Sequence, residues 1–253
     1  MLDIKEILEQ YETLKNEKQP YLPVYEIIGQ FVRLRKQNFT SDQLPSEFLI
    51  SDNVFDSTAP NSLSTMSAAL MGNMWPNGAK TFRLIPADSL PDSNEIKRYF
   101  EEITTRVANA MDHPKARLSI ALDEYMNDEG AFGTCGIAVF PNYDKDNPVS
   151  YKVWDVKTMV IDEDFNGVID TVFNEIQITI KKLVGKYGYQ NVSAQSKKLW
   201  DDRKYNHPVK VLHAIIPRPV DGQQQGGRTN KGMPWASYHI ELDNKHMLQE
   251  SGF

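Results

Sequence analysis

The chain has 253 residues, with 28 Lys and Arg residues against 34 Asp and Glu residues, which gives a net charge of −6. Its hydrophobic share of 40% and charged share of 25% are ordinary for a folded protein and exclude a disordered or collagen-like polymer. The acidic balance disfavours a domain built to grip DNA, because tight non-specific binding needs a surplus of Lys and Arg. No stretch approaches the roughly 18–20 apolar residues of a membrane-spanning helix, so we expect no membrane partner.

The first part of the chain is predicted to be helical. Apolar residues recur at helical spacing from Ile4 to Leu14, behind the capping residue Asp3. A second helix is expected to begin at Pro23, since proline suits the first helical turn. Residues 38–55 are polar and contain a proline, so they predict a connecting loop.

An unusual helix is expected to start near Asp56 and to end at Gly72. It is rich in small residues and almost free of charge, which is rare on a solvent-exposed helix. Such a helix can pack closely either in the core of its own chain or against another subunit. The candidate packing residues are Ser62, Met66, Ala68, Ala69 and Leu70.

The pattern changes from helical to strand-like near residue 133. A short strand is expected over 81–85, and two further helices before Gly130. Strands are expected over 134–140, 149–156, 158–162, 168–179, 209–216, 235–242 and 245–249, with short helices within 180–200. The predicted fold class is therefore α+β: a helical part (1–132) packed on a mostly antiparallel β part (133–253).

Motifs of common catalytic sites are missing. The chain has no phosphate-binding loop, no dinucleotide fingerprint, no His-Glu-x-x-His and no Gly-x-Ser-x-Gly, so we expect neither an enzyme nor a bound cofactor. A nucleophile pair of Cys135 and His213 has no local support, and Cys135 is interpreted as a buried small apolar residue. This lone cysteine fits synthesis in a reducing cytoplasm.

Residues 162–169 resemble the first half of a calcium-binding loop. Asp162, Asp164 and Asn166 occupy the positions of oxygen ligands, and Gly167 follows. Phe173 stands where the bidentate Glu would be required, and both flanks are predicted strands. We therefore interpret the segment as a β-turn, with these three residues as weak metal-binding candidates.

Two basic clusters could touch nucleic acid. One is Arg33, Arg35 and Lys36 at the end of the second helix, and the other is Lys181, Lys182 and Lys186. Short clusters of this kind are usually solvated helix faces, which is the interpretation we adopt. The Gly- and Gln-rich stretch from Asp221 to Lys231 predicts a protruding loop.

Four blocks of residues, taken in order, resemble the head-to-tail connector (portal) proteins of short-tailed, T7-like bacteriophages. The resemblance covers roughly residues 20–253. The blocks are Asp56-Ser57-Thr58-Ala59 with the small-residue helix, Trp75-Pro76 and Phe82-Arg83-Leu84; Glu124-Tyr125 leading into Gly133–Val139; Asp162–Phe173 around Asn166-Gly167; and a helix ending at Leu183–Gly188.

The resemblance implies a structural subunit in a ring of twelve at one vertex of the virion capsid. It implies contacts with major capsid and scaffolding proteins, the terminase motor and tail or adaptor proteins, and double-stranded DNA passing through the channel. It also implies that the chain is the wing-like front part of a C-terminally truncated subunit, without stem, clip or crown. No residue is assigned to DNA contact on this basis.

Two alternatives from other classes remain open. One is a calcium-binding or adhesion module that uses the loop from Asp162 to Gly167. The other is a metal-dependent nucleic-acid enzyme in which Asp162, Asp164 and Asp170 hold the metal ion.

Overall fold

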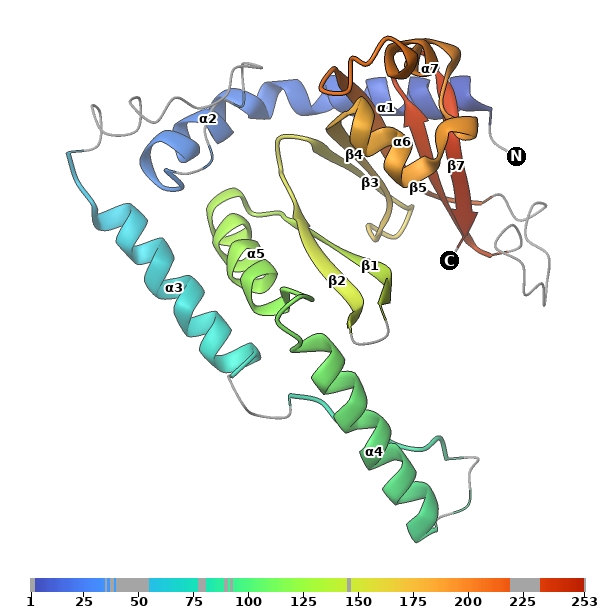
Figure 1. The fold of residues 1–253 in the computed structure, drawn as a ribbon. Helices are drawn as coiled ribbons and strands as arrows, with labels where there is room; N and C mark the ends of the chain where they lie inside the picture. Colours follow the sequence, from blue (N-terminus) through green and yellow to red (C-terminus); the bar gives the residue numbers. More distant parts are fainter. Residues whose placement is uncertain are drawn as a thin grey trace. The chain divides into compact units, whose positions relative to one another are not determined.

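A computed structural model describes residues 3–34, 36, 39, 55–76, 81–88, 91, 93–144, 147–218 and 233–252 (Figure 1). Helices and antiparallel sheets make up the described chain, which confirms the α+β prediction. The chain divides into two compact units: unit 1 is Met1–Tyr21 with Lys157–Phe253, and unit 2 is Leu22–Val156. The expected division after residue 132 marks the change from helix to strand, but it lies inside unit 2.

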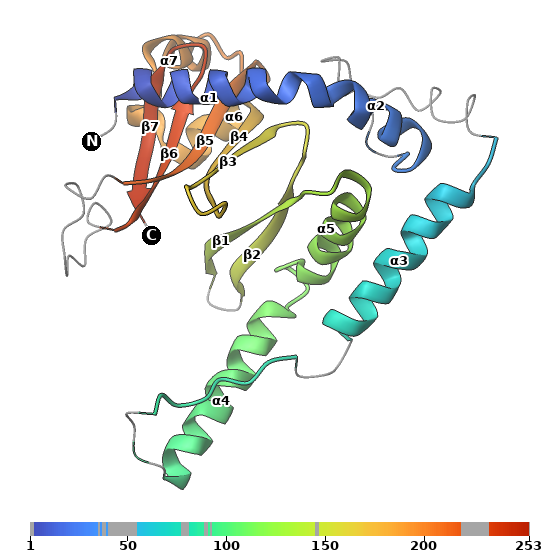
Figure 2. The ribbon, with the colours of Figure 1, turned by 180° about the vertical axis from the view of Figure 1, so that it is seen from behind.

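Unit 1 is built on a five-stranded antiparallel sheet whose strands follow chain order. Helix α1 (Ile4–Lys18) covers one face, and α6 (Ile180–Tyr187) and α7 (Ala194–Asp201) cover the other, as the opposite views of Figures 1 and 2 show. The strands are β3 (Met159–Glu163), β4 (Ile169–Thr179), β5 (Pro208–Pro217), β6 (Trp235–Glu241) and β7 (His246–Gly252).

Alternation along β5 creates a core on each side of this sheet. Leu212 and Ala214 are buried with Ile7 and Tyr11 of α1, and the ring centroids of Tyr11 and Phe173 of β4 lie 5.7 Å apart. Val209 and Val211 of β5 point to the other face, where they are buried with Ile180, Leu183 and Tyr187 of α6. Unit 1 is therefore a three-layer arrangement of helix, sheet and helices.

A polar contact fixes α1 to the sheet. The Tyr11 hydroxyl donates to Glu175 Oε2 over 2.7 Å, while Lys15 and Lys210 form ion pairs with the same carboxylate at 3.4 and 3.2 Å. Burial, with the added effect of the Glu175 charge, raises the pKa of Tyr11 well above its usual value. The hydroxyl therefore stays protonated and keeps its donor role.

The described residues of unit 2 form four α-helices and one β-hairpin. Ser93 caps α4, since its Oγ accepts a hydrogen bond from Ile96 N. Three aromatic rings, of Tyr25, Phe39 and Phe132, lie 5.1–5.7 Å apart and form a small core. The elements are α2 (Leu22–Phe31), α3 (Thr58–Met74), α4 (Asn94–Met111), α5 (Leu118–Phe132), β1 (Gly136–Asp144) and β2 (Asn147–Trp154).

The predicted strand over 81–85 is wrong. The described residues 81–88 contain no strand, and Leu84 N donates instead to the Thr104 hydroxyl of α4 over 3.0 Å. The N–H group of Leu84, which was expected to pair with a neighbouring strand, thus bonds to a helix side chain instead. The predicted loops over 38–55 and 221–231 lie outside the described residues, apart from Phe39 and Phe55.

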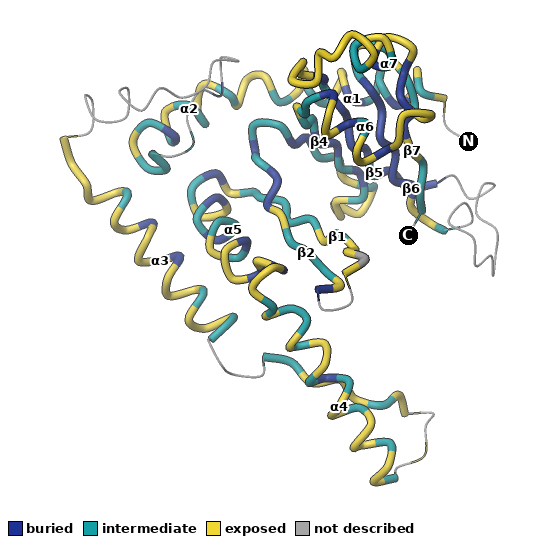
Figure 3. Tube along the Cα trace, viewed as in Figure 1, coloured by how far each residue is buried: buried dark blue, intermediate teal, exposed yellow. Residues whose placement is uncertain are grey.

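Burial is uneven along the chain. Figure 3 shows that buried positions gather on the strands of unit 1, whereas α3 and α4 of unit 2 are mostly exposed. Among the described residues, no helix is long and apolar enough to cross a membrane.

Candidate functional site

The charge-free helix of the sequence forms α3. The carboxylate Oδ1 of Asp56 accepts hydrogen bonds from both the N–H and the hydroxyl of Thr58, at 2.9 and 2.6 Å, which fixes the start of the helix. Its buried side chains are Leu63 and Ser67, and the Ser67 hydroxyl accepts a hydrogen bond from Asn127 of α5 over 2.8 Å. Gly130 of α5 lies against the end of the Met66 side chain and a methyl group of Leu63, so the two helices are in contact here.

None of the five predicted packing residues of α3 is buried, although the end of the Met66 side chain lies against Gly130 of α5. Ser62, Ala68 and Ala69 are exposed, and Met66 and Leu70 are 40% and 38% exposed. They do not form the core of this chain, and the residues that do, Leu63 and Ser67, were missed. Their spacing of four was the available signal. Packing of the exposed residues against another subunit stays a prediction.

A buried network of opposite charges lies in unit 2. Asp128 of α5 is 1% exposed; its Oδ1 accepts from Arg33 Nε at 2.8 Å and its Oδ2 lies 3.1 Å from Lys36 Nζ. Lys36 also pairs with Asp155 at 3.0 Å and with Glu124 at 3.1 Å. Burial alone would lower the pKa of Lys36, but the Asp155 and Asp128 charges raise it well above its usual value.

This network corrects one interpretation. Arg33 and Lys36 are not a solvated cluster, because both are ion-paired and mostly buried; Arg35 lies outside the described residues. Their carboxylate partner is about a hundred residues further along the chain, a separation that local pattern reading does not bridge. The arrangement ties the segment after α2 to α5.

Cys135 lies beside this network. Burial and the Asp128 charge raise the pKa of its thiol to about 12, so the thiol stays protonated and is a poor nucleophile. His213, its candidate partner, belongs to unit 1 and lies in a buried site of that unit.

The segment from Asp162 to Gly167 forms the turn of the β3–β4 hairpin. Asp164 Oδ1 accepts from the N–H groups of Asn166 and Val168 at 2.8 and 2.9 Å, and Gly167 has a φ of 75°. These hydrogen bonds, chiefly that from Val168, lower the pKa of the Asp164 carboxyl. The oxygens that would bind a cation thus hold the turn together.

Asp162 and Asp170 are engaged in the same local manner. Asp162 Oδ1 accepts from Glu163 N at 2.9 Å, and Asp170 Oδ1 accepts from the Thr171 hydroxyl at 2.9 Å. Within the described part of the chain, no group of three or more His, Cys, Asp or Glu side chains is placed to hold a metal ion.

Buried polar groups line the sheet face under α6 and α7. The fully buried Glu241 accepts hydrogen bonds from the N–H and hydroxyl of Ser193, at 3.1 and 2.7 Å, and from the Ser196 hydroxyl at 3.0 Å. Burial would raise its pKa, but these bonds lower it, so the carboxylate stays ionised at the N-terminus of α7.

The rings of His213 and His239 stack on the same face, with centroids 4.1 Å apart. Burial lowers the pKa of His213 to about 4 and that of His239 to about 2, with the neighbouring Lys186 adding to both shifts. Both rings are therefore neutral near pH 7.

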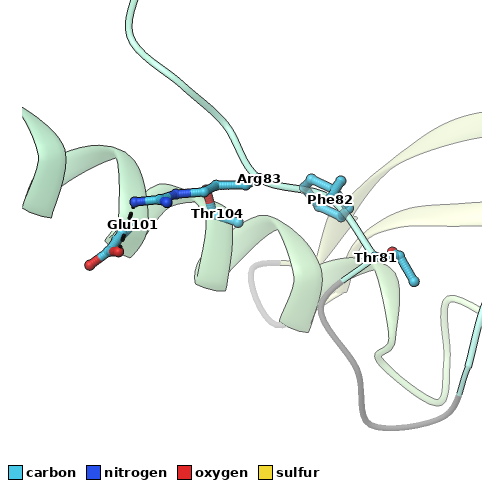
Figure 4. A pocket seen from close by; sticks show the side chains of 5 residues that line it. All are labelled: Thr81, Phe82, Arg83, Glu101 and Thr104. Carbon is cyan, nitrogen blue, oxygen red and sulfur yellow. Dashed lines mark hydrogen bonds and ion pairs between the residues drawn. The ribbon is translucent and has the colours of Figure 1, made fainter.

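A surface depression of about 460 Å³ lies between residues 81–83 and α4. Figure 4 shows the Arg83 side chain pointing toward Glu101, with which it forms an ion pair at 3.0 Å. Both of these side chains are largely exposed. Together with Thr81, Phe82 and Thr104, they offer a lining without a nucleophile and base pair.

Comparison with known proteins supplies the family. The model of the family described as "Bacteriophage head to tail connecting protein" matches residues 4–253. The chain belongs to this family. It is 25% identical over 252 residues to the "Probable portal protein" of Bordetella phage BPP-1, and 23% identical over 250 residues to the "Portal protein" of Salmonella phage epsilon15. Each match covers 98% of this chain and 44% of the relative, so the chain spans less than half the length of either.

The blocks that carried the connector resemblance occupy distinct places in the fold. The first comprises the start and body of α3 and the extended segment beside α4. The second is the end of α5, where Gly133 has a φ of 76°, and the first residues of β1. The last two are the β3–β4 hairpin and the end of α6, which closes at Gly188 with a φ of 83°. In this connector protein, two glycines thus end helices in a conformation that other residues rarely adopt.

Proposed function

We propose that the chain forms part of a portal subunit, a structural component of the virion. Twelve copies form a ring at one capsid vertex, where the ring nucleates head assembly, serves as a conduit for packaging and ejecting double-stranded DNA, and anchors the tail. Its partners are the major capsid and scaffolding proteins, the terminase motor, and tail or adaptor proteins. The observation that carries this proposal is the family match over residues 4–253.

The chemistry of the described residues agrees with a structural role. The buried ionisable groups Asp128 and Glu241 are engaged in internal contacts, Asp128 with Arg33 and Glu241 with Ser193. The net charge of −6 indicates that the chain as a whole is not built to hold DNA tightly, because tight non-specific binding needs a surplus of Lys and Arg.

Exposed apolar rows on unit 2 support contacts between subunits. On α3, Met66, Leu70 and Met74 follow one another every four residues, and all three are exposed. A second exposed row on α2 contains Val24 and Phe31. A closed ring needs two different patches on each subunit, one for each neighbour, and unit 2 carries two.

Negative-stain imaging of the full-length protein tests the ring. We expect rings with a central hole, and particles no larger than dimers under assembly conditions would refute the proposal.

The substitution Ala69→Glu tests the place of α3. Because Ala69 is exposed, we expect the variant to fold with an unchanged melting temperature but to form fewer rings, since the new charge would be buried without a partner. Ala194→Glu, at an exposed position of α7, is the matched control and should assemble normally. Normal rings from Ala69→Glu would show that this face of α3 is not the contact, while the ring itself would stand.

A further inference from the structure

Positive charge is concentrated in one short segment of this acidic chain. Between residues 181 and 204 there are seven cations and two carboxylates, a local net charge of +5 in a chain of net −6. The cations are Lys181, Lys182, Lys186, Lys197, Lys198, Arg203 and Lys204. We call the surface they form on α6, α7 and the following turn the basic surface.

The fold brings the two ends of this segment together. Ile180 N donates to His207 O at 3.0 Å, and Lys181 N donates to Tyr205 O at 3.1 Å, so the start of α6 lies against the turn that follows α7. In that turn Lys204 N donates to Leu199 O at 2.9 Å. Segments about twenty residues apart in sequence, both carrying cations, therefore lie side by side, whereas the sequence pattern indicated only the cluster of Lys181, Lys182 and Lys186.

Most of these charges are exposed and several are not neutralised. Lys181, Lys182 and Arg203 are exposed and form no ion pair among the described residues. By contrast, Arg33 and Lys36 of unit 2 both pair with the buried carboxylate of Asp128. Of the two acids in the segment, Asp201 accepts hydrogen bonds from the Tyr189 hydroxyl at 3.0 and 3.2 Å.

The two lysines in the first turn of α6 do not stabilise this helix. Lys181 and Lys182 occupy the first turn of this helix, where the helix dipole favours acidic residues and disfavours cations. The first two N–H groups of the helix already donate to His207 O and Tyr205 O, so the helix terminus is not itself a binding site. Residues that destabilise their own helix and make no stabilising contact within the chain are typical of sites that bind an external partner.

The basic surface rests on a fixed platform. Ile180 and Leu183 of α6 are fully buried against β5, and Glu241 of β6 holds the start of α7 through Ser193 and Ser196. The backbone that carries Lys181, Lys182, Lys197 and Lys198 is thus fixed by a packed core, so binding has to order the side chains but not the helices.

We infer that the basic surface binds the phosphate backbone of duplex DNA without reading its sequence. Several exposed Lys and Arg side chains held on one packed scaffold fit phosphates spaced along a duplex, and Lys181, Lys182 and Arg203 form no ion pair among the described residues. This inference rests on the proposed function as a conduit for DNA. It assigns contact with the DNA to one surface of an otherwise acidic chain.

Fluorescence anisotropy of the full-length protein with a labelled random-sequence duplex tests the inference. The double variant Lys181→Glu/Lys182→Glu should bind DNA at least about tenfold more weakly at low salt, and the slope of log affinity against log salt should fall by about two. The matched control is Arg98→Glu/Lys152→Glu, which changes the net charge equally at exposed positions of unit 2. It should retain most of the affinity.

Equal losses in the two double variants would overturn the inference, because total charge would then explain the binding. Binding to poly-glutamate but not to duplex DNA would replace the nucleic acid by an acidic protein partner. Negative-stain images separate this result from the proposed function: rings that do not bind DNA refute the basic surface alone, and DNA binding without rings refutes the ring alone.

Discussion

Replacing Asp128 by Asn should destabilise unit 2 strongly. The substitution keeps the shape of the side chain but removes the charge that faces Arg33 at 2.8 Å and Lys36 at 3.1 Å. Breaking a buried ion pair from one side costs about 3–5 kcal/mol, because the remaining charge stays desolvated. Lys36 retains Glu124 and Asp155, whereas Arg33 loses the only carboxylate paired with it among the described residues. We therefore expect a loss of about 2–4 kcal/mol in the free energy of unfolding.

Urea denaturation followed by tryptophan fluorescence measures this loss, since Trp154 is buried in the same unit. The control is Glu102→Gln, which removes the carboxylate of the exposed Arg106–Glu102 pair and should cost at most about 0.5 kcal/mol. A double-mutant cycle with Arg33→Ala and Asp128→Ala should give a coupling energy above about 1 kcal/mol. A loss from Asp128→Asn no larger than that of Glu102→Gln would show that the network contributes little to stability.

Three further predictions concern unit 1. The pKa values of His213 and His239 lie below their usual value, so below about pH 6.5 the unfolded chain binds protons that the folded chain does not. The free energy of unfolding should therefore fall as the pH drops below about 6.5, by up to about 1.4 kcal/mol per pH unit for each ring. Urea titrations across this range should show a weaker dependence in His239→Phe and an unchanged one in the exposed control His207→Gln; equal dependence in all three proteins would refute the assignment. Glu241→Gln should lower stability by about 1–3 kcal/mol and increase hydrogen exchange at the start of α7, since an amide nitrogen, which cannot accept, replaces either the oxygen that faces Ser193 N or the one that faces the two serine hydroxyls. Phe173→Ala should lower the urea midpoint by an amount that corresponds to about 3–5 kcal/mol, because the ring is fully buried under α1; a loss below that of Glu102→Gln would contradict the packing described.

Local chemistry made part of the fold predictable. Asn166-Gly167 between two β-rich runs predicted the β3–β4 hairpin, and the structure confirms it with the positive φ of Gly167. The apolar spacing after Asp3 likewise predicted α1, whose first turn is fixed by a bond from Asp3 N to Glu6.

Contacts between distant residues escaped prediction. Nothing near Arg33 indicates Asp128, and nothing near Lys181 indicates Tyr205, although both contacts decide how the cations are used. The small residues of α3 marked the correct helix, but periodicity alone did not show that Leu63 and Ser67 face α5. The partner of each face is set by the tertiary fold, and a single sequence does not reveal it.

Unit 1 is made of two segments, one before and one after unit 2 in the sequence, and this order affects folding during synthesis. Helix α1 leaves the ribosome early, but β5 and β6, which bury its Ile7 and Tyr11, follow only after all of unit 2. At about 5–20 residues per second, the apolar side of α1 waits on the order of ten seconds or more for its sheet. Unit 2 is contiguous in the chain, so it can fold during that delay, before the sheet of unit 1 is complete.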